Sequence, residues 1–215
     1  IEWCVRMNKI ICFSGQQRNG KDESADHLVT KLSGWHRSSF AGDVKATFCD
    51  MFNVDLAFIE KWKTNPEPPL GFIMNVRDSL IFIGDGFRQI QPQIWVERCF
   101  KKSKYPVILS DGRYFSELRK VRELDGINVL IYRDGFLNDI KNASESELRP
   151  LIEFYIESGI DGPTAEYLYN RTVPLEEVRL VDYFIRNDSD LNSLYNKIDQ
   201  NLVPFIQRKI VRCQD

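Results

Sequence analysis

Short apolar runs bounded by glycine or polar residues recur along the chain. Two of them, Lys9–Ser14 and Val107–Asp111, have the continuous apolar character of strands buried on both faces of a sheet. The run Ile127–Tyr132 has the same character, and Tyr183–Ile185 indicates a last strand. A weaker strand is expected at Ser39–Phe40.

Segments with helical spacing of apolar residues separate these runs. The first follows a glycine-rich turn and has Gly34 as a plausible stop. The last begins at about Ser189. The segment Val44–Phe52 is expected to be helical. The apolar residues at helical spacing in the other segments are Ala25, Leu28, Val29 and Leu32, then Ile73, Val76, Leu80 and Ile83, then Trp95 and Cys99, then Phe115, Leu118, Val121 and Leu124, and finally Leu191, Leu194, Ile198 and Leu202, which are expected to face inward.

Strands that alternate with helices predict an α/β fold of three layers, with a parallel sheet between two helical layers. The 215 residues suit one domain, which we take as residues 9–215. Residues 134–180 are polar, tyrosine-rich and long for a connection, so we expect an inserted helical lid there. A fixed helical insertion is the alternative. The lid surface is expected to include Tyr155, Tyr167, Tyr169 and Arg171.

Composition and charge exclude several classes of protein. A hydrophobic content of 43% argues against global disorder, and a net charge of -2 argues against polymeric nucleic acid as a partner. A local patch of Arg98, Lys101, Lys102 and Lys104 keeps that partner open. No apolar stretch reaches the roughly 18 residues of a membrane helix. Five widely spaced cysteines indicate reduced thiols and a cytoplasmic location.

The turn after the first strand carries the clearest chemical motif. Gly15 to Asp22 reads GQQRNGKD, which has the P-loop spacing G-x-x-x-x-G-K between a strand and a helix. Backbone N–H groups of Gly15, Arg18, Asn19 and Gly20 are expected to surround the phosphates of ATP. Lys21 is expected to contact the β- and γ-phosphates. A glycine-rich turn with an incidental lysine is the alternative.

Asp22 occupies the position at which most P-loops have serine or threonine. A hydroxyl there binds Mg²⁺, and a carboxylate can do so directly or through water. Asp22 is also explained as an acid that the helix dipole favours.

The end of the strand Val107–Asp111 contributes a second group of polar residues. Ligands of parallel α/β sheets bind beyond the carboxyl ends of the strands. Asp111 is therefore expected to bind Mg²⁺ or to position the acceptor, and Arg113 to bind a phosphate. Glu117 follows one helical turn later. The alternatives are a helix cap for Asp111 and a solvated helix position for Glu117.

Cationic residues between the first two clear strands suit an anionic acceptor. Arg77 and Arg88 are eleven positions apart and share one helix face if the helix continues through Gly84 and Gly86. Lys45 begins another helix. Solvated surface positions are the alternative for all three cations.

Two further residues follow later strands. Arg133 ends one strand and Asn187 ends the last, where a P-loop kinase holds the donor base. Asn187 is equally a natural turn residue.

Together these motifs resemble the phage deoxynucleoside monophosphate kinases. That family's P-loop pattern, SG-x-x-R-x-GKD-T-x-AD, corresponds to Ser14–Asp26, so the resemblance accounts for Asp22. Its A-G-x-x-K motif corresponds to Ala41–Lys45, and its D-T-R-x-x-x-E motif to Asp111–Glu117. Its arginine-rich helix with a downstream tryptophan, its strand-end arginine and its late N-D correspond to Arg77–Arg88, Trp95, Arg133 and Asn187-Asp188.

The match covers Lys9 to about Tyr132 and again Asp182 to Leu194. The chain departs from the family at Glu23 and Gly112, which replace threonines, and at Ile81, which replaces glutamine. The segment after Arg133 is also much longer. These differences bear on the metal or phosphate contact and on the identity of the acceptor.

The resemblance implies transfer of the ATP γ-phosphoryl group to a deoxynucleoside 5′-monophosphate, with Mg²⁺, in a P-loop NTPase-type fold. Lys21, Asp22, Asp111 and Arg113 are then the catalytic residues, and Asp22 and Asp111 the metal ligands. The expected acceptor ligands are Lys45, Arg77, Arg88, Arg113 and Glu117. A phage-encoded protein would act in the host cytoplasm, and a homodimer remains open.

Three alternatives remain open from the sequence. Phosphomevalonate kinases of animals share the GKD loop and an S-D-x-R strand end, here Ser110–Arg113. Phage kinases that act on hydroxymethyluracil in DNA are similar in outline. The third alternative, from a different class, is a regulatory protein that binds nucleotide without turnover.

Overall fold

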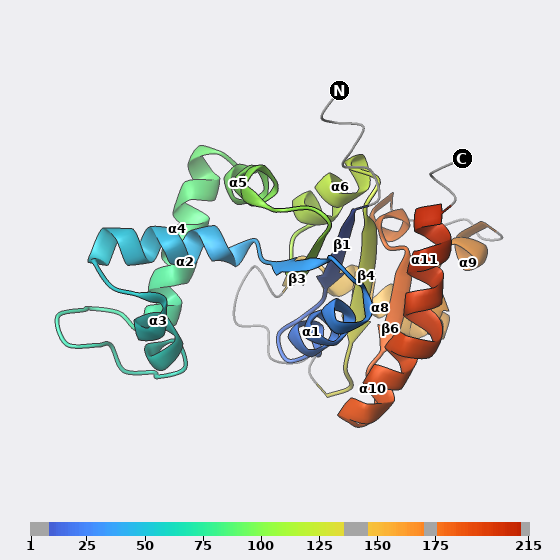
Figure 1. Ribbon diagram of the computed structural model, residues 1–215. Helices are drawn as coiled ribbons and strands as arrows, with labels where there is room; N and C mark the ends of the chain where they lie inside the picture. The colour runs from blue at the N-terminus through green and yellow to red at the C-terminus, as the bar shows by residue number, and fades with distance from the viewer. Residues whose placement is uncertain (1–8, 136–145, 170–175, 212–215) are drawn as a thin grey trace. The chain divides into compact units, whose positions relative to one another are not determined.

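The computed structural model describes residues 9–135, 146–169 and 176–211, and it divides into two compact units (Figure 1). The sheet unit comprises the chain up to Ser38 and again from Lys104. The helical unit comprises Ser39–Ser103. A separate compact unit over these residues was not among the expectations from the sequence.

The sheet unit is built on six strands in the order β2-β3-β1-β4-β6-β5. The pairings from β2 to β6 are all parallel, and β5 pairs antiparallel with β6 at one edge. The strands are β1 Ile10–Ser14, β2 His36–Ser38, β3 Val107–Gly112, β4 Ile127–Tyr132, β5 Gly162–Pro163 and β6 Tyr183–Arg186. The predicted parallel sheet is confirmed.

Alternation along the strands divides the core into two layers. Val129 and Ile131 of β4 face one apolar cluster, and Leu130 and Tyr132 face the other, as the period of two in a strand requires. The first cluster is covered by α1 Lys21–Lys31, α10 Leu191–Lys197, the π-helical turn Ile198–Leu202 and α11 Val203–Val211. The second cluster is covered by α6 Phe115–Glu123, α8 Arg149–Ser158 and the 3₁₀ turn Glu176–Leu180. One further short helix, α9 Ala165–Tyr169, lies between β5 and the 3₁₀ turn in the sequence.

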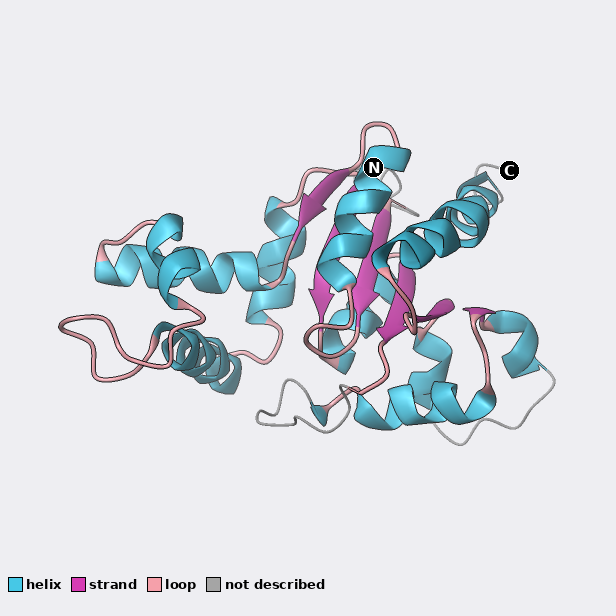
Figure 2. Cartoon of the chain, turned by 90° about the horizontal axis from the view of Figure 1, so that it is seen from below, coloured by secondary structure: helices cyan, strands magenta, loops and turns pink. Residues whose placement is uncertain are grey.

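Helices therefore lie on both faces of the sheet, which makes this unit the predicted P-loop NTPase-type three-layer α/β/α fold (Figure 2). Cys12 is in no disulfide, and its thiol lies buried within β1. Cys49 and Cys99 are likewise in no disulfide, whereas Cys4 and Cys213 lie outside the described residues.

The helical unit contains α2 Ala41–Phe52, α3 Leu56–Trp62, α4 Val76–Ile90 and α5 Ile94–Lys102. Local chemistry starts two of these helices, because Asp55 caps Phe58 N and Asn75 caps Asp78 N, both at 2.8 Å. The unit has its own apolar cluster of Val44, Phe48, Ile59, Val76, Ile83 and Trp95. The α4 helix continues through Gly84 and Gly86, so the glycine pair does not break it.

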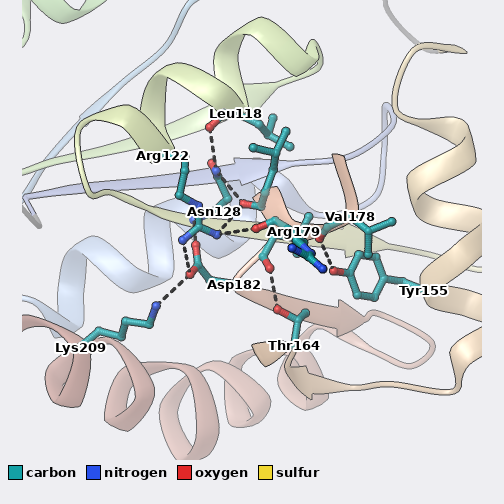
Figure 3. A network of polar contacts seen from close by, with 11 residues as sticks. Leu118, Arg122, Asn128, Tyr155, Thr164, Val178, Arg179, Asp182 and Lys209 are labelled. Carbon is teal, nitrogen blue, oxygen red and sulfur yellow. Dashed lines mark hydrogen bonds and ion pairs between the residues drawn. The ribbon is translucent and has the colours of Figure 1, made fainter. Parts of the chain in front are cut away.

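A network of polar contacts fixes the amino ends of β4 and β6 (Figure 3). The buried Asp182 carboxylate accepts from Asn128 N at 2.9 Å, Arg122 Nη1 at 3.0 Å and Lys209 Nζ at 2.9 Å. Asn128 Nδ2 donates to the carbonyls of Leu118 and Leu180. This network joins α6, β4, β6 and α11 through groups that compensate the buried charge.

Several expected elements differ from those observed. The strand expected at Ser39–Phe40 lies earlier, at His36–Ser38, because β2 pairs with Val107–Leu109 of β3. Ile73 precedes α4 and is fully exposed, and Leu191 is 47% exposed rather than inward. Both errors concern residues at or beyond a helix end, where apolar spacing alone does not fix the boundary.

The segment expected to form a lid is partly core. Leu151, Ile152 and Tyr155 of α8 are buried, and Tyr155 OH donates to Val178 O at 2.7 Å. The prediction that Tyr155 lies on a lid surface is wrong, because its ring stacks on Phe184 within the core of the sheet unit. Tyr167 is partly buried, the side chain of Tyr169 is not described, and Arg171 lies outside the described residues.

Candidate functional site

The P-loop connects the end of β1 to the start of α1. Gly15 and Gly20 have φ angles of 136° and 99°, a region that glycine enters without strain. A Cβ on Gly15 would lie 2.3 Å from Ile131 O, and one on Gly20 would lie 2.7 Å from Asn187 Nδ2. Both glycines are therefore required by backbone conformation and by close packing. Arg18 also has a positive φ, 64°, and is exposed on the loop.

Two asparagines attach this loop to the neighbouring strands. Asn19 is buried, and its Nδ2 donates to Ile131 O of β4 at 3.1 Å. Asn187 follows β6, and its Nδ2 donates to Asn19 O at 3.0 Å. The amides hold the loop shape from two strands. Donor-base binding by Asn187 and by the exposed Arg133 stays a prediction.

Lys21 lies at the centre of the site. It is 5% exposed, and its Nζ donates to Gly15 O at 2.8 Å and Gln16 O at 2.6 Å. Burial, followed by the positive charge of Arg113, lowers the pKa of Lys21 to about 7. Asp22 and Asp111 act in the opposite direction. All four predicted catalytic residues thus lie near enough to interact electrostatically.

The end of β3 is shaped by an irregularity in its pairing with β1. Cys12 pairs with Leu109 but Ser14 pairs with Gly112, so β3 takes three residue steps where β1 takes two. Such a bulge changes the direction of a side chain at a strand end, and here it falls at Ser110 and Asp111. A Cβ on Gly112 would lie 2.8 Å from Cys12 Sγ, so a larger residue at this position would require Cys12 or the strand end to shift.

Glu117 supports the segment that carries Arg113. The Glu117 side chain is buried, and its Oε2 accepts from Arg113 N at 2.7 Å and Tyr114 N at 3.0 Å. The carboxylate thereby caps the first turn of α6. The alternative of a solvated helix position for Glu117 is wrong, while contact with the acceptor stays a prediction.

Asp22 pairs with an arginine that the sequence analysis did not single out. Its Oδ1 accepts from Arg37 Nη2 of β2 and from Ser110 Oγ of β3, the latter at 3.1 Å. Arg37 Nη1 also pairs with Asp26, one helical turn after Asp22. Arg37 is a single arginine in the short strand β2, which has no clear apolar pattern, so no motif in the sequence indicated that it belongs to the site.

The remaining predicted acceptor ligands belong to the helical unit. Lys45 Nζ pairs with Glu60 Oε1 at 2.9 Å, and Arg88 Nη1 pairs with Asp85 Oδ1 at 3.1 Å. Arg77 and Arg88 lie on the single helix α4, as the spacing predicted, and Arg77 is exposed. Their convergence with Arg113 of the sheet unit stays a prediction.

A magnesium ion fits the oxygen chemistry of the sheet unit. Within residues 9–135, 146–169 and 176–211, no three His, Cys, Asp or Glu side chains are grouped as a metal site. Mg²⁺ commonly binds through one or two carboxylates together with the phosphates of its nucleotide. Asp22 and Asp111, both close to Lys21, fit that incomplete type of site.

The comparison with curated proteins gives one informative relative. The chain is 25% identical over 183 residues to a protein of Acanthamoeba polyphaga mimivirus named "Putative deoxynucleotide monophosphate kinase". The aligned region covers 76% of this chain and 94% of the viral protein. No protein-family model matches the chain.

Solved structures of small-molecule kinases are similar at low identity. A shikimate kinase from Acinetobacter baumannii is 15% identical with a TM-score of 0.46, over 90% of this chain and 92% of that one. A dephospho-CoA kinase from Campylobacter jejuni is 12% identical with a TM-score of 0.40, over 89% and 96% of the two chains. Separately, no helix among the described residues is long and apolar enough to cross a membrane.

Proposed function

We propose that this protein is a P-loop kinase that transfers the γ-phosphoryl group of ATP to a deoxynucleoside 5′-monophosphate. The observation that supports it most is the buried Lys21 at the start of α1, near Asp22, Asp111 and Arg113. Burial and Arg113 disfavour the charged form of Lys21 in spite of its two carbonyl acceptors, so an anion bound in the loop would stabilise the ammonium. A polyphosphate supplies that anion.

The donor half of the site belongs to the sheet unit. Backbone N–H groups of the loop and the amino end of α1 bind the phosphates, and Lys21 supports the charge that develops on them during transfer. Arg18, Arg133 and Asn187 are proposed ligands of ATP. When bound, Mg²⁺ at Asp22 and Asp111 supplies charge neutralisation and fixes the phosphates.

The proposed ligands of the acceptor are Arg113 and Glu117 of the sheet unit and three cations of the helical unit. Lys45, Arg77 and Arg88 each carry a positive charge suited to a dianionic phosphate. The Glu117 carboxylate accepts from the backbone N–H of Arg113 and so fixes the backbone position from which the Arg113 side chain extends. The name of the viral relative and the resemblance of the motifs support a deoxynucleoside monophosphate as the acceptor.

The rest of the assignment concerns domain organisation. We take residues 9–215 as one kinase domain with a lid insertion over 134–180. The α8 helix inside that insertion contributes buried residues to the core, which counts against closure of the segment as a whole. Limited proteolysis with and without ATP plus acceptor tests this, and an unchanged cleavage pattern would contradict it.

A direct assay separates the proposed substrates. Purified protein and labelled ATP are presented with each deoxynucleoside monophosphate, with mevalonate phosphate and with DNA that contains hydroxymethyluracil. We expect label in deoxynucleoside diphosphates. Label only in DNA or only in mevalonate diphosphate overturns the acceptor but keeps the kinase. Binding of ATP without transfer to any acceptor favours a regulatory nucleotide-binding protein.

A further inference from the structure

Arg37 occupies a position that connects three elements of the sheet unit. It lies on the edge strand β2 in register with Ile108 of β3. Ile108 belongs to the apolar cluster that α1 covers, and Ser110 lies two residues further along β3. Arg37 therefore extends along the α1 side of the sheet, where it reaches Ser110 and the first turns of α1.

The contacts of Arg37 centre on the carboxylate of Asp22. Arg37 Nη2 donates to Asp22 Oδ1, and Arg37 Nε and Nη2 donate to Ser110 Oγ at 3.3 and 3.0 Å. Ser110 Oγ donates in turn to the same Asp22 oxygen at 3.1 Å. The guanidinium and the hydroxyl thus fix the direction of a carboxylate that stands where other P-loops have a neutral hydroxyl.

That carboxylate creates an electrostatic problem for an anion-binding loop. Asp22 adds a full negative charge beside the Lys21 ammonium, at the helix end that must accept polyphosphate. The Asp22 carboxylate and the phosphates are both negatively charged and repel each other, and this repulsion is strongest when no metal ion lies between them. The Arg37 guanidinium, which pairs with both Asp22 and Asp26, offsets part of this charge and keeps the Asp22 carboxylate in place.

We infer that Arg37 is a positioning residue that neutralises and orients Asp22, so that a P-loop of the GKD type can accept the phosphates of ATP. The inference rests on the proposed function and adds a residue outside the motif to the donor site. Its competitor is a merely structural role, in which Arg37 joins β2 to α1 through Asp26 as an ordinary partly exposed ion pair.

A double-mutant cycle distinguishes the two roles. Wild type, Arg37→Gln, Asp22→Ser and the double variant are compared by calorimetric ATP binding in EDTA and again in Mg²⁺. We expect Arg37→Gln to weaken metal-free binding by about 10-fold or more, because Asp22 then repels the phosphates. In the Asp22→Ser background the same change should cost less than about 3-fold. An equal loss in both backgrounds overturns the inference.

Two further variants act as controls. Asp26→Asn removes the other acid paired with Arg37 and leaves Asp22 unchanged, so ATP affinity should change by less than about 3-fold. Arg37→Lys keeps the charge but loses the fork geometry, and it should retain part of the affinity. A loss in Asp26→Asn equal to that in Arg37→Gln supports the structural role and overturns ours.

The design remains decisive if Arg37→Gln does not fold. Asp22→Ser alone should then tighten metal-free ATP binding by a few-fold, because the carboxylate beside the loop is removed while Arg37 stays in place, paired with Asp26 only. Unchanged or weaker metal-free binding in that variant contradicts the inference. Failure of wild type itself to bind ATP would contradict the proposed function instead, so the two failures are distinguishable.

Discussion

Two acidic residues of the sheet unit, Asp22 and Asp182, each pair with an arginine, but at opposite ends of the parallel strands. Asp22 follows the P-loop at the carboxyl end of β1, and its side chain is 71% exposed. Asp182 precedes β6 at the amino end of the sheet, and its side chain is 4% exposed. Figure 3 shows the three donors that surround Asp182.

The difference between these acids separates stability from function. Asp182 bonds to a backbone amide and two cations, which leaves nothing for a ligand to displace without loss of folding free energy. Asp22 bonds to Arg37 and Ser110 in an exposed pair, which contributes little to stability. At the carboxyl ends of the strands the charge of Asp22 is therefore accessible to a ligand. At their amino ends the charge of Asp182 is buried in contacts that stabilise the fold.

The largest change in stability is expected at the amino end. Asp182→Ala leaves the buried Asn128 amide without its acceptor and breaks both ion pairs. We expect a loss of about 3 kcal/mol in the free energy of unfolding, since the partners Arg122 and Lys209 can still reach water. Urea unfolding measures this. A loss below about 1 kcal/mol would show that the network does not stabilise the fold.

The largest change in activity is expected at the carboxyl end. Lys21→Ala should lower turnover at least about 100-fold, because phosphoryl transfer depends on stabilisation of charge. Lys209→Ala is the matched control, since Lys209 pairs with Asp182 at the amino end. It should reduce the thermal midpoint and leave the turnover of folded protein within about 3-fold. Near-normal turnover in Lys21→Ala would contradict the kinase proposal.

The pH dependence of ATP binding tests the environment of Lys21. In the protein without ATP, burial and Arg113 lower the pKa of Lys21 to about 7, so the protonated fraction of Lys21 falls as the pH rises above that value. Bound phosphate favours the charged ammonium and raises the pKa again. ATP binding near pH 7 to 8 should therefore take up a proton and weaken as the pH increases.

Calorimetry in buffers of different ionisation enthalpy measures that proton uptake directly. Lys21→Arg is the matched variant, because arginine stays protonated throughout this range. We therefore expect that ATP binding to Lys21→Arg takes up no proton over this pH range. Uptake of the same size in both proteins would assign the proton to another group.

The smallest effect is expected from an exposed pair on the helix that carries Arg122. Arg119 pairs with Glu177 at 2.7 Å, and its side chain is 53% exposed. Arg119→Ala should cost less than about 1 kcal/mol, whereas Arg122→Ala, three residues later, should cost more. Parallel urea titrations of the two variants compare them. Equal losses would show that the exposed and the buried arginine pairs stabilise the fold to the same extent.

Local patterns in the sequence were sufficient for most of the sheet unit. The strands β1, β3, β4 and β6 each follow from a continuous apolar run, and the P-loop follows from glycine spacing between a strand and a helix. The continuity of α4 from Arg77 to Arg88 also agreed with its apolar stripe. These features depend on residues close together in the chain, where periodicity and backbone sterics decide the outcome.

The sequence by itself therefore determined the layered α/β fold. It also indicated that Lys21 and Asp22 follow one strand and that Asp111 and Arg113 lie at the end of another, β3, which pairs parallel with β1. Only the tertiary structure decided what depends on distant segments. It placed Arg37 on Asp22 and Ser110, made Tyr155 core, and gave the helical unit its own compact core. The physical reason is that a weak edge strand or a tyrosine carries no local signal of its partner, which is fixed only when sheet pairing brings the segments together.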